Sequence, residues 1–155
     1  MKAVVFAMVT LLVGSASAAE SVYVTTELTR NGETVDSFSG LIVSGVKRPH
    51  RNIELRKFRD SGSQNKVKLA DLELGTTSSI TPVITGAGIE LSYDVNYVRL
   101  MQMDTARMGN LVIDQPRTEG FKHSSSVLLF DGEKKQYRSI EDGVEYVYTL
   151  SATKR

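Results

Sequence analysis

Residues 89–103, IELSYDVNYVRLMQM, show the clearest strand pattern of this chain. In the first half of this stretch, apolar side chains occupy every second position and polar side chains fill the gaps, so an extended segment places the apolar ones on one face. These apolar positions are Ile89, Leu91, Tyr93, Val95 and Tyr97. At Tyr97 and Val98 the apolar phase changes, as it does at a β-bulge or where a strand passes to another sheet. The pattern predicts the long inner strand of a β-sandwich.

Shorter segments of the same kind lie on both sides of this stretch, separated by turn dipeptides. Strands are predicted at 21–30, 35–46, around 53–58, and at 67–74, 76–85, 111–114, 127–130, 135–140 and 144–151. Asn31-Gly32, Asp131-Gly132 and Asp142-Gly143 predict hairpins, because such dipeptides readily take positive φ angles. Pro82 favours an edge position for its strand, and residues 61–65 and 117–126 are predicted loops. The sequence therefore predicts an all-β fold, an antiparallel β-sandwich of about eight to ten strands.

The N-terminus has the three parts of a secretory signal peptide. Lys2 is followed by an apolar run from Ala3 to Val13 and then by the small residues Ala16-Ser17-Ala18. The apolar run is well short of the roughly 20 residues that a membrane-spanning helix needs. We expect residues 1–18 to be cleaved, and residues 19–155 to form a single β-sandwich domain in the periplasm or outside the cell, with no transmembrane segment in the mature chain.

Cysteine is absent from the chain. This excludes a disulfide framework, a thiol nucleophile, thiolate metal ligands and a lipid-modified N-terminal cysteine. The formal net charge is +1, from 19 basic and 18 acidic residues. Such a balance gives no general attraction to polyanions, and nucleic acid is not a predicted partner.

Patterns that carry catalytic chemistry are few. SQNK at 63–66 and SATK at 151–154 match Ser-x-x-Lys, in which a lysine assists acylation of the serine, but the companion Ser-Asp-Asn and Lys-Thr-Gly elements are missing. The two histidines, His50 and His123, lie in predicted loops without a second ligand at metal-binding spacing. A hydrolase that uses Ser63 is thus the weakest hypothesis. We predict no catalytic residue, no metal ligand and no cofactor, hence no enzyme.

A basic segment spans residues 47–59. Its cations are Lys47, Arg48, Arg51, Arg56, Lys57 and Arg59, against Glu54 as the one acidic residue in 47–59. On an extended strand Arg56 points opposite to Lys57 and Arg59, so the cations form no single stripe. Two interpretations stay open: a binding site for a glycan phosphate, a lipid headgroup or an acidic partner, and a solvated strand edge that resists aggregation.

The second half carries three motifs in order: a Gly-led strand, GIELSYDV at 88–95, a Pro-ended strand, LVIDQP at 111–116, and a Ser-rich segment, SSSVLLFDGE at 124–133. In this order they resemble the β-rich part of the secretin family, the outer-membrane channels of secretion and type IV pilus systems. The proline that secretins carry near Asn96 and the glycine near Ser139 are missing. The chain is also much shorter than a secretin. The resemblance implies a small periplasmic relative or accessory of an export, pilus or conjugation apparatus.

The predicted function is therefore that of a non-catalytic periplasmic β-domain that works by protein–protein contact, as an accessory or scaffold component of a secretion, pilus or conjugation apparatus. Its predicted partner is an envelope protein complex or further copies of itself, through exposed strand edges. The alternative is a soluble periplasmic binding module that takes a glycan or lipid headgroup at segment 47–59.

Overall fold

The computed structural model describes residues 19–63 and 66–155. The predicted signal peptide, 1–18, and the two central residues of the first Ser-x-x-Lys pattern lie outside these ranges. Eight strands follow one another: β1 (Ser21–Arg30), β2 (Glu33–Val43), β3 (Arg48–Ser63), β4 (Lys66–Thr85), β5 (Gly88–Met108), β6 (Leu111–Leu129), β7 (Lys134–Glu141) and β8 (Val144–Lys154). Every pairing between them is antiparallel. The all-β prediction is confirmed. Within the described ranges, no helix is long and apolar enough to span a membrane.

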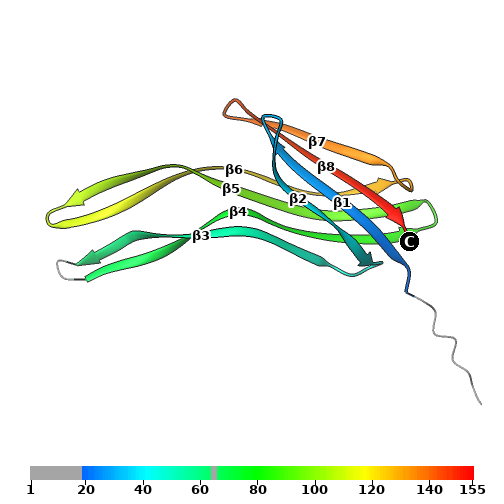
Figure 1. The fold of residues 1–155 in the computed structure, drawn as a ribbon, viewed down its shortest axis with the longest axis horizontal. Helices are drawn as coiled ribbons and strands as arrows, with labels where there is room; N and C mark the ends of the chain where they lie inside the picture. The colour runs from blue at the N-terminus through cyan, green and yellow to red at the C-terminus, as the bar shows by residue number, and fades with distance from the viewer. Residues whose placement is uncertain (1–18, 64–65) are drawn as a thin grey trace, which may run out of the picture.

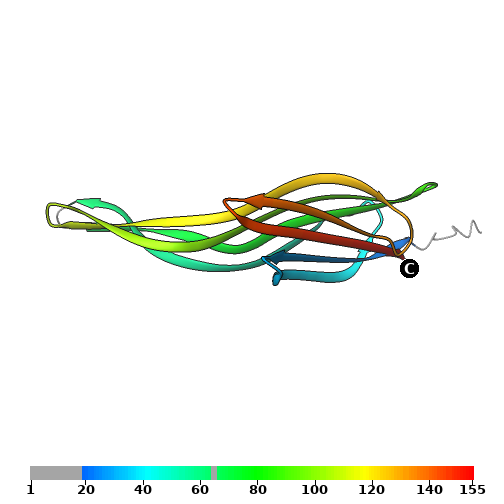
Figure 2. The same ribbon diagram turned by 90° about the horizontal axis from the view of Figure 1, so that it is seen from above.

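The strands form two sheets of unequal length. A small sheet has the order β2-β1-β8-β7 and a long sheet the order β3-β4-β5-β6. Strands of the small sheet have 8 to 11 residues, whereas those of the long sheet have 16 to 21. The small sheet therefore covers only part of the long one, and the long strands run on past it (Figures 1 and 2). We call the covered part the sandwich half, and residues 53–74 and 99–119 the arm.

The core lies wholly in the sandwich half. The alternating face predicted for 89–97 is buried, while Glu90, Ser92 and Asp94 on the other face are exposed. The small sheet contributes a matching buried face of Val22, Val24, Leu28, Tyr146, Tyr148, Leu150 and Ala152. Among the described residues, no arm side chain is buried. The hydrophobic effect thus holds the two sheets together at one end of the molecule and leaves the other end one sheet thick.

Two of the three predicted hairpins are confirmed by their backbone angles. Asn31 and Gly32 have φ of 49° and 82°, and Asp142 and Gly143 have φ of 50° and 79°. The third prediction is wrong, because β6 belongs to the long sheet and β7 to the small one. The turn at Asp131-Gly132 carries the chain between the sheets instead. A turn dipeptide reverses the chain, but it does not decide whether the two strands pair.

Several predicted boundaries are wrong because long-range pairing overrides the local pattern. The strands predicted at 67–74 and 76–85 are one strand, β4. The predicted loop 117–126 lies inside β6, where it pairs with β5 from Arg117 opposite Gln102 to Ser126 opposite Ser92. β4 is not an edge strand as Pro82 predicted, since it lies between β3 and β5, but Pro82 itself has no partner residue on β3. Proline is tolerated there because β3 begins opposite Ile80, so β4 needs no donor from Pro82 on that side.

Candidate interaction edges of the long sheet

The long sheet divides at a fork between its two central strands. β4 and β5 pair from Thr85 opposite Gly88 to Gly75 opposite Val98, and beyond this point their ladder ends. Gly75 has φ of 107°, and a Cβ atom on it would collide with the carbonyl oxygen of Asn52. Only glycine fits this position. The phase change that the sequence shows at Tyr97 and Val98 thus falls where β5 leaves the sandwich half.

In the arm, the two hairpins β3/β4 and β5/β6 meet through the strands that are outermost in the sandwich half. β3 and β6 flank the long sheet at its covered end, yet they lie against each other in the arm (Figure 1). The Asp114 carboxylate of β6 accepts three hydrogen bonds from Arg59 of β3: one from the backbone N–H at 2.8 Å, one from Nε at 3.0 Å and one from Nη2 at 2.6 Å. A second contact brings the Leu111 side chain beside Gly62.

The contact with Arg59 also changes the titration of Asp114. Hydrogen bonds from the Arg59 guanidinium and backbone N–H lower the pKa of Asp114 below its ordinary value of 3.8, and the same contact raises the pKa of Arg59. Both shifts favour the charged forms. The ion pair therefore forms across the whole neutral and mildly acidic range.

We expect Asp114→Asn to destabilise the protein at pH 7 but not in strong acid. Because the folded pKa of Asp114 is lowered, the unfolded chain binds the extra proton first, so the stabilisation is complete above about pH 4 and is lost as the pH falls through the lowered pKa. Urea unfolding at pH 7 and pH 2 measures the difference. Asp104→Asn is the matched control, since Asp104 pairs with Arg117 inside one hairpin at 3.2 Å. An equal effect of the two variants at pH 7 would contradict the role of Asp114.

Open backbone edges follow from this arrangement. Among the described residues, no strand pairs with the outer edges of β3 and β6 in the sandwich half. In the arm, β4 below residue 75 pairs with β3 and β5 above residue 98 pairs with β6, and no described strand pairs with the other edge of either. Large apolar side chains of the arm are also exposed: Leu55, Val67, Leu69 and Met101 have 48% to 58% of their surface open to solvent. Long edges beside apolar side chains are templates for pairing with another chain.

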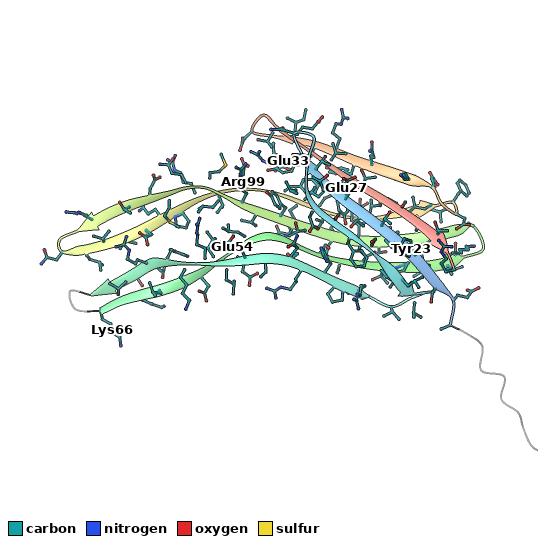
Figure 3. The ribbon with its side chains drawn as sticks, viewed as in Figure 1. Tyr23, Glu27, Glu33, Glu54, Lys66 and Arg99 are labelled. Atoms are coloured by element: carbon teal, nitrogen blue, oxygen red, sulfur yellow. The ribbon has the colours of Figure 1, made fainter. Side chains whose placement is uncertain are left out.

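A cleft of about 460 Å³ opens at the fork. Val35 of the small sheet, Arg56 and Leu74 of one hairpin, and Arg99 of the other line it. Figure 3 shows Arg99 and Glu54 on opposite sides of the space between the hairpins. Near Arg99, Glu119 pairs with Arg30 of β1 at 2.6 Å and with Arg99 at 3.6 Å. This cluster ties the small sheet to the root of the β5/β6 hairpin.

The basic segment does not form one patch. Arg51 pairs with Glu73 at 3.1 Å and Arg59 with Asp114, so two of the six predicted binding cations have carboxylate partners. Arg56 lines the fork cleft, while Lys47 lies beside a separate polar hollow with Asp94. Arg48 and Lys57 are exposed. Binding by Lys47, Arg48, Arg51, Arg56, Lys57 and Arg59 stays a prediction.

Both histidines lie on strands, so their predicted placement in loops is wrong. His50 Nε2 is 3.2 Å from Asp36 Oδ1, which also accepts a hydrogen bond from Asn52 at 2.9 Å. His123 stacks on Tyr137 with 3.5 Å between the ring centroids, and burial lowers its pKa. Within residues 19–63 and 66–155, no three His, Cys, Asp or Glu residues gather in a group that could hold a metal ion.

The second Ser-x-x-Lys match is placed on β8. Residues three apart on a strand point to opposite faces, so Lys154 points away from the side of the sheet that carries Ser151. The Ser151 hydroxyl instead meets the Thr25 hydroxyl of the neighbouring strand. A lysine on the other face is not positioned to activate this serine.

The residues that join the hairpins give no signal in the sequence. The local pattern places Asp114 at the end of a short strand and Glu119 in a loop. Arg59 and Asp114 are 55 positions apart, and their contact depends on the twist of two hairpins. In a single sequence, no spacing signal connects them.

Comparison with known proteins identifies the fold. No family model matches the sequence, and no curated protein matches it. Solved structures do match. The type III secretion injectisome secretin InvG of Salmonella matches with TM-score 0.53 and 11% identity over 88% of this chain and 61% of that chain. The type IV competence pilus secretin PilQ of V. cholerae matches with TM-score 0.54 and 13% identity over 97% and 49%. This chain therefore spans less than two thirds of those chains, and it shares the fold of their secretin domains.

Proposed function

We propose that this chain is a non-catalytic structural protein of a secretion or pilus apparatus, which works by contact with other envelope proteins. The observation that carries the proposal is the long sheet with open edges, in a fold shared with the secretins InvG and PilQ. InvG is part of the injectisome basal body together with PrgH and PrgK. The open edges of this chain suit a comparable position in an assembly.

The arm combines open backbone edges with exposed apolar side chains. A sheet with exposed apolar side chains and unpaired backbone groups gains free energy when another chain covers it. Backbone hydrogen bonds along an added strand supply affinity, and side chains beside the edge supply specificity. Leu69 stands on β4 beside its open edge, and Leu55 is exposed on the paired strand β3. The arm is therefore the surface that we assign to the partner.

The periplasm is the compartment that fits this role. A periplasmic location is supported by the signal peptide predicted at residues 1–18 and by the resemblance to secretins. In an oxidising compartment many small domains use disulfides. This chain has no cysteine and depends on its core instead.

Co-purification from an envelope extract tests the proposal. We expect the tagged full chain to recover components of a secretion or pilus apparatus, identified by mass spectrometry. The double variant Leu55→Lys with Leu69→Lys should lose them, because two charges on the arm oppose an apolar contact. Phe130→Lys, a change at a similarly exposed apolar residue outside the arm, should retain them. Recovery of no such component by the parent chain would refute the proposal.

A further inference from the structure

Two arginines with spare hydrogen-bond donors line the fork cleft. Arg56 comes from the β3/β4 hairpin and Arg99 from the β5/β6 hairpin. Among the described residues, Arg56 forms no ion pair. Arg99 reaches Glu119 Oε1 only at 3.6 Å, and that oxygen already accepts a hydrogen bond from Arg30 Nε at 2.8 Å. Both guanidinium groups of the cleft therefore keep donors for a ligand.

The charge of the cleft favours an anion. Its charged lining residues are Arg56, Arg99 and Glu54, two cations against one carboxylate, so the formal charge of its lining is +1. Glu54 and Arg99 lie on opposite sides of the space between the hairpins (Figure 3). Arginine suits a carboxylate or a phosphate, because its planar set of donors matches two acceptor oxygens.

A buried hydroxyl beside the cleft also lacks a partner. The Thr76 side chain is 1% exposed, and its Oγ1 has no hydrogen-bond partner among the described residues. In the sheet, Thr76 stands between Asn52 of β3 and Tyr97 of β5, and both of these neighbours line the cleft. A buried hydroxyl without a partner costs free energy, which a bound polar group recovers. Unsatisfied polar groups of β3, β4 and β5 therefore surround one cleft.

We propose that the fork cleft binds the C-terminal carboxylate of an extended peptide segment of a partner protein. The inference rests on the proposed function and deepens it, because it names the part of the partner that is held. The open edges of β4 and β5 begin at this cleft, where their ladder ends at Gly75 opposite Val98. The residues before the carboxylate can pair with one of these edges, whereas a free phosphate cannot.

The size and the apolar lining of the cleft fit the last residues of such a peptide. Its volume of about 460 Å³ lies within the range of roughly 300–1,000 Å³ that is typical of ligand pockets. Val35, Leu74 and Leu100 line it beside the two arginines. We therefore expect the terminal residue of the bound peptide to carry an apolar side chain.

Retention of peptides on the immobilised full chain tests the site. The probe is a pool of short peptides of randomised sequence, made once with a free C-terminal carboxylate and once with a C-terminal amide. We expect the chain to retain the carboxylate pool roughly tenfold more strongly, because the amide forms no charge-assisted hydrogen bond with either arginine. Arg56→Gln combined with Arg99→Gln should lose this preference. Equal retention of the two pools by the parent chain would overturn the proposal.

Lys57→Gln combined with Arg107→Gln is the matched control. It also removes one cation from each hairpin, but neither side chain lines the cleft. This variant should keep its preference for the carboxylate pool. An equal loss of preference in the two double variants would indicate a general effect of net charge and would contradict a site at the fork.

Two single variants keep the inference testable if the double arginine variant fails to fold. Glu54→Gln removes the one carboxylate of the cleft lining, so retention of the carboxylate pool should rise roughly threefold. Thr76→Val keeps the shape of the side chain but removes the unpaired hydroxyl, so retention should fall without a loss of stability. Unchanged retention in both variants would count against the site.

Inorganic phosphate distinguishes a peptide carboxylate from a free anion. Phosphate offers similar acceptor oxygens but no backbone that can pair with a strand edge, so at equal concentration it should not displace the retained peptides. Displacement would overturn the peptide as the occupant. The proposed function would still stand after such a result if the tagged chain recovered envelope components, so the two failures are distinguishable.

Discussion

Truncation of Leu91 to alanine is expected to lower the free energy of unfolding by about 3 kcal/mol. Leu91 is fully buried on the inner face of β5, between the two sheets. Removing the side-chain carbons beyond Cβ costs their transfer free energy and leaves a cavity that the sheets cannot close. Chemical denaturation monitored by circular dichroism measures this loss directly.

Leu69→Ala is the matched control for Leu91→Ala. The same atoms are removed from β4 in the arm, where 55% of the Leu69 surface is already exposed. We expect a change within about 0.5 kcal/mol, as is usual for surface substitutions. Comparable losses at the two leucines would show that the arm is covered in the isolated protein, contrary to a core confined to the sandwich half.

Gly75→Ala is expected to destabilise the protein by about 2 kcal/mol or more. The substitution forces a non-glycine residue to adopt φ of 107° and drives its Cβ into the carbonyl oxygen of Asn52 on the neighbouring strand. To avoid this collision, the β3/β4 hairpin has to move where it leaves the sandwich half. We therefore expect lower stability together with a changed fork, seen as chemical-shift changes at Asn52 and Val98.

Gly86→Ala provides the comparison for Gly75→Ala. Gly86 lies in the turn between β4 and β5, and a Cβ atom there would meet nothing within 4 Å. Its free energy of unfolding should change by less than about 0.5 kcal/mol. If Gly75→Ala were equally harmless, the backbone of the fork would be free to relax and Gly75 would not fix it.

The half-buried alternation of β5 and the glycine turns could be predicted because they depend on neighbours in the chain. Leu91 alternates with Ser92 whatever else the chain does, and Asn31-Gly32 supplies its own positive φ angles. The turn at Asp131-Gly132 could not be assigned to a hairpin or a crossover, since that choice depends on which sheet receives the next strand. The loop prediction for residues 117–126 is wrong for a similar reason. Their side chains are mostly polar, as in a loop, but their backbone is paired with β5 throughout.

Three features could be derived from the amino-acid sequence alone: the all-β class, the inner face of β5 and two hairpins. Each follows from the period of apolar residues or from the φ angles that a residue allows. The strand order, the extent of the arm and the meeting of Arg59 with Asp114 depend instead on the fold as a whole. Those features arise from the twist of paired strands and from the unequal length of two sheets. Twist and length act between residues far apart in the chain, so no local pattern records them.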